Sequence, residues 1–96
     1  MIKLVDGYFL AVNDPYFVSL YRTVYDEETG EEDYEECVSH FDNLSNAIER
    51  AKEIICNVRI AQAGDISLDE AEQIMIRAEL DVDNLRYNPE KMFYTE

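Results

Sequence analysis

Positively charged residues are scarce in this chain. Eight Lys and Arg stand against 22 Asp and Glu among 96 residues, which gives a net charge of −14. Such a surface repels nucleic acid and anionic lipid, so direct binding to DNA, RNA or a membrane is disfavoured. Solubility of a small domain requires a net charge of only about 2–8 in magnitude. We therefore expect the excess negative charge to serve the binding of a basic protein surface. The alternative is an acidic protein whose charge has no specific role.

Cysteine and histidine are also rare. Cys37 and Cys56 are too few for a disulfide framework, and their apolar neighbours predict that both are reduced core residues. The one histidine, His40, lies three residues from Cys37 in a predicted strand. Alternation places these two side chains on opposite faces, so no Cys–His dyad is expected. Two Cys and one His do not make a zinc site.

Motifs of catalysis and metal binding are absent as well. Residues 81–84 resemble the start of a calcium loop, but Arg86 stands where its glycine belongs and Met92 stands where its glutamate belongs. No nucleophile elbow, zinc-protease helix or phosphate loop occurs. We expect a protein that is not an enzyme, with no catalytic residue, metal or cofactor.

Long uncharged runs are missing too. Asp6 interrupts the first apolar stretch, so no signal-peptide core is expected, and no run approaches the roughly 20 residues of a membrane span. The expected location is the cytoplasm. A chain of 96 residues holds one core, so residues 1–96 are expected to form a single domain.

The first half of the chain has the pattern of β-strands. Aromatic and apolar residues at 8–12, 16–25 and 34–41 predict three strands, the second alternating clearly between two faces. The acidic segment 26–33 contains Gly30, which can adopt a positive φ, and is expected to be a hairpin loop.

The second half has helical periodicity. An apolar residue recurs every three or four positions from Leu44 to Val58, after a capping residue at Asp42 or Asn43, and Gly64 ends this helix. Ser67 and Glu70 form a capping box for a second helix, with a further turn or short helix before Pro89. The fold class is therefore α+β: a three-stranded antiparallel meander over about 8–41, followed by two or three helices over about 43–86 on one face. The expected core consists of Val18, Leu20, Ile48, Ala51, Ile55, Val58, Ile74 and Met75.

Two surfaces are candidates for partner binding. The first is the acidic hairpin, where eight carboxylates within eleven residues cannot neutralise one another and can meet the Lys and Arg that hold phosphates. Its residues are Asp26, Glu27, Glu28, Glu31, Glu32, Asp33, Glu35 and Glu36. The second is an aromatic stripe of Phe17, Tyr21 and Tyr25, which faces outward if Val18, Leu20 and Val24 face the helices. A solvated loop tip is the alternative for the first surface, and reversed strand faces or a homodimer contact are the alternatives for the second.

The layout resembles that of small phage or mobile-element inhibitors of the anti-CRISPR kind. The features are the acidic hairpin 26–36, the strand-to-helix join 39–44 and the short helical remainder. The resemblance is one of size, charge and layout, with no diagnostic motif. It implies a stoichiometric inhibitor that occupies the basic nucleic-acid surface of a bacterial defence nuclease such as a Cas effector, in the cytoplasm of an infected host. A homodimeric structural or regulatory module that uses the aromatic sheet face is the alternative function.

Overall fold

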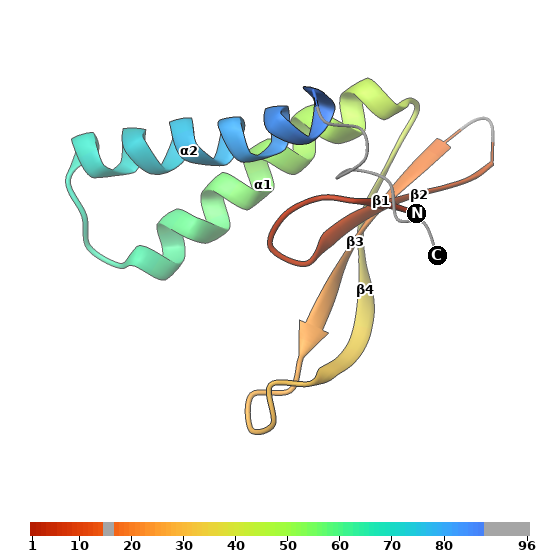
Figure 1. Ribbon diagram of the computed structural model, residues 1–96, viewed down its shortest axis with the longest axis horizontal. Helices are drawn as coiled ribbons and strands as arrows, with labels where there is room; N and C mark the ends of the chain where they lie inside the picture. The colour runs from red at the N-terminus through yellow and green to blue at the C-terminus, as the bar shows by residue number, and fades with distance from the viewer. Residues whose placement is uncertain (15–16, 88–96) are drawn as a thin grey trace.

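The chain combines a four-stranded antiparallel sheet with two long helices, as the computed structural model shows (Figure 1). The structure describes residues 1–14 and 17–87. The strands are β1 (Ile2–Lys3), β2 (Tyr8–Asp14), β3 (Phe17–Tyr25) and β4 (Glu32–Phe41), and the helices are α1 (Leu44–Ala63) and α2 (Leu68–Tyr87). The predicted α+β class is confirmed. Tyr16, Pro89 and residues 90–96 lie outside the described residues.

The sheet is a meander in the order β1-β2-β3-β4, so it contains one strand more than the three expected. The additional strand, β1, turns into β2 through Asp6 and Gly7, whose φ angles are 59° and 82°. Two successive positive φ angles define the tight hairpin turn that Asp-Gly pairs favour. Tyr8 N donates to Val5 O at 3.1 Å and closes the turn.

Strand β4 is irregular at two positions. Leu20 pairs with Ser39 whereas Tyr21 pairs with Cys37, so Val38 is an extra residue on β4. A second irregularity separates the Val24–Tyr34 pair from the Tyr25–Glu32 pair. An extra residue of this kind is a β-bulge, and side chains on its two sides no longer follow simple alternation.

The helices begin and end at the residues that the sequence indicates. Asn43 caps α1, its side chain accepting from Asn46 N at 2.9 Å, and Gly64 follows the last turn with a φ of 78°. Glu70 N donates to Ser67 Oγ at 3.1 Å, as a capping box requires. The further turn expected near residues 80–85 is instead the continuation of α2, which runs unbroken to Tyr87.

The core lies between one face of the sheet and the helices. Helix α1 packs on β3 and β4, and α2 packs along α1. Five of the eight predicted core residues are buried: Val18, Leu20, Ile48, Ala51 and Ile55.

The prediction for three core residues was wrong. Val58 and Ile74 are half-buried, and Met75 is 43% exposed. The cause is the orientation of α2, which turns Ala78 and Val82 into the core in place of Met75.

Ion pairs connect the sheet turn and the two helices. Arg59 of α1 donates to Asp6 at 2.7 and 3.0 Å and to Asp81 of α2 at 2.8 Å. The hydrogen bond with Asp6 raises the pKa of Arg59, burial lowers it, and Asp81 raises it, so the balance favours the charged guanidinium. Lys52 of α1 similarly contacts Asp83 of α2 at 2.7 Å.

Candidate functional site

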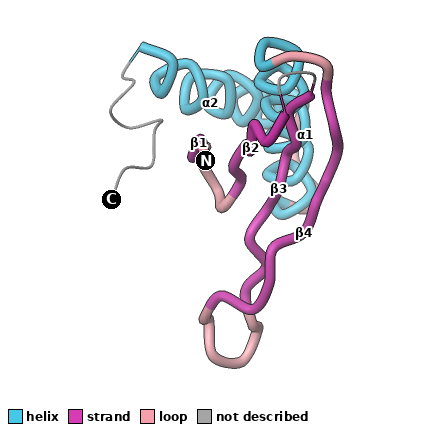
Figure 2. Tube along the Cα trace, turned by 90° about the vertical axis from the view of Figure 1, so that its right-hand side faces the viewer, coloured by secondary structure: helices cyan, strands magenta, loops and turns pink. Residues whose placement is uncertain are grey.

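The β3–β4 hairpin extends beyond the helices as an arm. Figures 1 and 2 show it projecting away from α1 and α2, which lie against the opposite end of the same strands. We call residues 22–36 the acidic arm. On β4, every residue from Glu32 to Val38 is exposed.

Hydrogen bonds within the loop hold the tip of the acidic arm. Asp26 Oδ1 accepts from the backbone N–H groups of Glu28 at 2.7 Å and Thr29 at 3.1 Å. Asp26 N donates to Glu31 O, and Gly30 N donates to Asp26 O, both at 2.8 Å. Gly30 has a φ of 74°, a conformation that L side chains rarely adopt. The loop therefore holds its carboxylates in a defined arrangement.

Two of the eight predicted binding carboxylates are engaged within the protein. Asp26 stabilises the loop, and Glu36 accepts from Arg22 Nε at 2.7 Å. The hydrogen bond with Glu36, and then the negative charge of Glu36, raise the pKa of Arg22. Both groups therefore have a local structural role.

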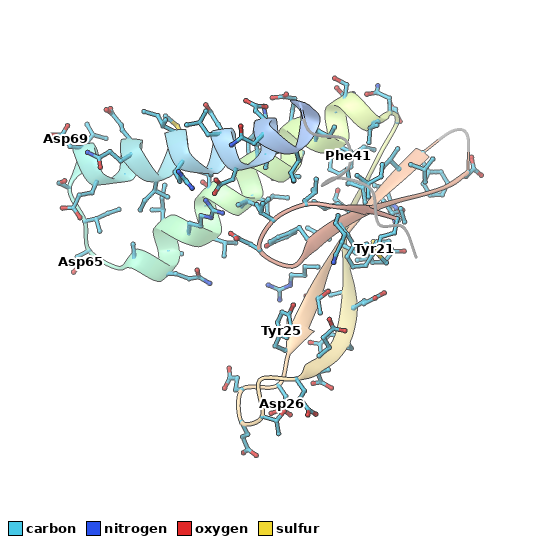
Figure 3. The ribbon with its side chains drawn as sticks, in the orientation of Figure 1. Tyr21, Tyr25, Asp26, Phe41, Asp65 and Asp69 are labelled. Atoms are coloured by element: carbon cyan, nitrogen blue, oxygen red, sulfur yellow. The ribbon has the colours of Figure 1, made fainter. Side chains whose placement is uncertain are left out.

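The other six carboxylates are exposed, and no described residue forms an ion pair or hydrogen bond with their side chains. These residues are Glu27, Glu28, Glu31, Glu32, Asp33 and Glu35. They lie on the loop and on β4, and Figure 3 shows the labelled Asp26 at the far end of the acidic arm, away from the helices. The structure thus brings together the carboxylates that the sequence singled out and leaves six of them without a described ion pair, with Lys3 of β1 beside Glu32 and Glu35 around one groove.

The three aromatic residues of the predicted stripe have different surroundings. Tyr21 stacks on Phe9, with ring centroids 5.3 Å apart and planes 9° apart, and is half-buried. The rings of Phe17 and His40 make an edge contact, with their centroids 5.5 Å apart. Tyr25 is 50% exposed. Of the three, only Tyr25 is both exposed and part of the acidic arm.

Tyr34 is a further exposed aromatic residue that the sequence analysis did not select. It lies on β4 opposite Val24, and 55% of its surface is exposed. The sequence feature that could have pointed to Tyr34 is its position among four acidic residues, Glu32, Asp33, Glu35 and Glu36. Tyr25 and Tyr34 give the acidic arm two large side chains that can bury area against a partner.

A groove at the base of the acidic arm contains two arginines but does not present free positive charge. Asp6, Tyr8, Arg22, Arg59 and Asp81 contribute to its walls. Arg22 is paired with Glu36, and Arg59 is paired with Asp6 and Asp81. The groove is therefore not suited to an anionic ligand.

The prediction for Cys37 and His40 was wrong in two respects. Cys37 is exposed rather than in the core, and its Sγ lies 3.8 Å from His40 Nε2. The cause is the extra residue at Val38, because it shifts the alternation by one position and so places Cys37 and His40 on the same face of the sheet. Both cysteines are free thiols, as predicted, and Cys56 is buried.

Neither a metal site nor a membrane span is present in residues 1–14 and 17–87. No three His, Cys, Asp or Glu side chains in this part are grouped so that they could hold a metal ion. Neither of its helices is long and apolar enough to cross a membrane.

Comparison with known proteins places the chain in no group. No family model matches it, and no significant match was found among curated proteins or solved structures.

Proposed function

We propose that this chain is a binding protein whose acidic arm docks on a Lys- and Arg-lined surface of a partner protein and competes there with nucleic acid. The observation that carries the proposal is the set of six exposed carboxylates on a hairpin that projects beyond the helices. The role is stoichiometric binding, without catalysis.

The spacing of charge on β4 suits this role. A strand rises about 3.4 Å per residue, and one strand of DNA carries a phosphate about every 3.4 Å along the helix axis. Four of the five β4 residues from Glu32 to Glu36 are acidic, and of these only Glu36 is paired with a described residue, Arg22. The acidic part of β4 therefore has a linear charge density of the same order as that of one nucleic-acid strand.

Carboxylates can replace phosphates at such a surface because both accept charge-assisted hydrogen bonds from Arg and Lys. A single exposed pair contributes only about 0–1 kcal/mol. Affinity therefore depends on several pairs together with an aromatic anchor, for which Tyr25 and Tyr34 are available. The net charge of −14 also attracts a basic partner over distance and accelerates association.

The kind of partner is proposed from the resemblance to anti-CRISPR proteins. We propose a bacterial defence nuclease such as a Cas effector, met in the cytoplasm of an infected host. The basic groove of such a nuclease holds a nucleic-acid strand mainly through the strand's backbone. This is the surface that a linear array of carboxylates would occupy.

Competition binding tests the proposal. Purified Cas effectors are loaded with fluorescent DNA, and the chain is added while the anisotropy of the DNA is followed. We expect displacement from at least one effector, with weaker binding of the chain when salt rises from about 50 to about 200 mM. Binding without displacement would contradict charge mimicry and would leave the aromatic sheet face or α2 as the contact.

A further inference from the structure

A thiol, an imidazole and a hydroxyl meet on the sheet next to the acidic arm. His40 Nε2 lies 3.8 Å from Cys37 Sγ, and His40 Nδ1 lies 2.8 Å from Ser19 Oγ. Cys37 is exposed, whereas Ser19 is only 2% exposed. An exposed thiol is thus in contact with a histidine whose other nitrogen is held by a buried group.

We propose that Cys37 is a modification site at which the chain forms a mixed disulfide with a small-molecule disulfide, and that His40 accepts the thiol proton. This site is separate from the proposed binding role of the acidic arm, and neither proposal depends on the other.

The reaction is an ordinary thiol–disulfide exchange. The Cys37 S–H bond breaks and its proton moves to His40 Nε2. The Cys37 sulfur then bonds to one sulfur of the small disulfide, whose own S–S bond breaks. The other sulfur leaves as a thiolate, so Cys37 is oxidised and the small disulfide is reduced.

Ser19 acts as a positioning residue in this arrangement. When His40 carries its proton on Nδ1 and donates it to Ser19 Oγ, the lone pair of Nε2 faces the thiol. The edge contact with the Phe17 ring, at a centroid distance of 5.5 Å, further restricts the orientation of the imidazole. A base oriented by a third group is the usual arrangement for activating a nucleophile.

The two cysteines differ in the features that control reactivity. Cys56 is buried in the core cluster between the sheet and the helices. Cys37 is exposed and contacts a potential base. Thiol reactivity follows access and thiolate formation, so Cys37 is the reactive position and Cys56 provides an internal control.

The charged and titratable groups around Cys37 and His40 favour a cationic disulfide. Glu35 and Glu36 precede Cys37 on β4, and Asp42 lies two residues after His40, just beyond the end of this strand. On β3, Tyr21 pairs with Cys37, and Arg22 is bound to Glu36. The described surroundings are therefore mainly anionic. They attract a cationic disulfide such as cystamine more than anionic oxidised glutathione.

The test measures modification at each cysteine by mass spectrometry after timed exposure to cystamine or oxidised glutathione, from pH 6 to 9. We expect Cys37 to react much faster than Cys56. We also expect Cys37 to react faster with cystamine than with oxidised glutathione, and the ratio of these two rates to fall when salt is added. In His40→Gln the reaction with cystamine near neutral pH should be roughly tenfold slower, because an unassisted thiol is only a few per cent thiolate near pH 7. The dependence on pH should also move to higher pH.

Ser19→Ala removes one hydroxyl and serves as the second variant. It should slow the reaction and shift the pH profile in the same direction as His40→Gln, which loss of packing alone would not do. Equal rates in wild type and His40→Gln would overturn the proposal. A Cys37 rate in the native protein no higher than in the urea-unfolded chain would also overturn it, and that comparison needs no variant.

Discussion

At the scale of single residues, Arg59 connects the β1–β2 turn with both helices. It contacts Asp6 in the β1–β2 turn and Asp81 on α2, and its side chain is 21% exposed. Few side chains other than arginine could do this, because the planar guanidinium donates in several directions at once. No local pattern predicts these contacts, since 53 residues separate Arg59 from Asp6.

Arg59→Met should therefore lower the free energy of unfolding by roughly 1–2 kcal/mol, because Asp6 loses its arginine partner and the more buried Asp81 keeps only the exposed Arg77 of its two. Arg50 provides a matched control, since it pairs with Glu53 within one helix turn and both side chains are more than half exposed. Arg50→Met should cost only about 0.3–0.5 kcal/mol. Urea unfolding measures both. Equal losses would show that the Arg59 contacts contribute no more than a surface pair.

The second prediction at the residue scale concerns the backbone conformation of Gly7. Its φ of 82° is unfavourable for any residue with a Cβ, although the nearest atom to an added Cβ would be Tyr25 Cε2 at an acceptable 3.6 Å. Gly7→Ala should therefore cost about 1 kcal/mol or more through backbone strain alone. The loss should be visible as faster amide exchange in β1 and β2. Unchanged exchange there would contradict the assigned turn.

At the scale of elements, the strands and helices that have a periodic sequence pattern were predicted, and the irregular features that have no such pattern were missed. The period of two and the period of 3.6 correctly indicated the three long strands and both helices. The short strand β1 was missed because two paired residues give no period, although Asp6-Gly7 is a strong hairpin signal. The Val38 bulge was missed because nothing in β4 distinguishes it, and one extra residue placed Cys37 beside His40.

The face of α2 that packs on the core could not be predicted from the sequence pattern either. The apolar residues of this helix occupy more than one stripe, so periodicity alone did not decide which stripe faces the core. The structure buries Ala78 and Val82 and exposes Met75 and Ile76. The choice depends on packing against α1 and the sheet, which the pattern of one helix does not contain.

Val82→Ala should consequently cost about 1–3 kcal/mol, because it removes fully buried methyl groups and leaves a cavity. Met75→Ala should change stability by less than about 0.5 kcal/mol, as is usual for a surface position. Chemical unfolding of the two variants compares them directly. The reverse order of the two losses would mean that α2 is rotated relative to the structure.

At the scale of the whole molecule, the acidic arm was the most predictable part of the candidate site and the aromatic stripe the least. Carboxylates in a loop stay exposed in almost any fold, so their position in sequence was sufficient. The burial of an aromatic residue depends instead on which neighbours the fold supplies. Tyr21 stacks on Phe9, a neighbour supplied by β2 pairing.

The net charge of −14 also predicts how stability responds to salt. Repulsion among the carboxylates opposes the compact state, and salt screens it to within about 8 Å at physiological ionic strength. The melting temperature should therefore rise by several degrees when sodium chloride is added, since about 1 kcal/mol corresponds to about 4–8 °C for a domain of this size. Thermal unfolding followed by circular dichroism measures this. A fall in melting temperature would show that attractive pairs such as Arg59–Asp6 outweigh the repulsion.

The proposed binding role depends on where the charge lies as well as on its amount. Glu28, Glu32 and Glu35 lie on the acidic arm, whereas Asp65, Glu72 and Glu79 are exposed on α2 and the loop before it. Figure 3 shows Asp26 at the end of the acidic arm and Asp65 at the turn between α1 and α2, on separate parts of the molecule. Substituting Lys at either set of three changes the net charge equally, so the two triple variants separate local from overall electrostatics.

The decisive measurement is the concentration of each triple variant that displaces labelled DNA from an effector to which the wild-type chain binds. We predict that the α2 variant displaces DNA nearly as well as wild type, with only a modest loss from the weaker overall field. The arm variant should fail to displace it while retaining the wild-type circular dichroism spectrum. Equal displacement by the two variants would contradict the central claim that the acidic arm takes the place of nucleic acid.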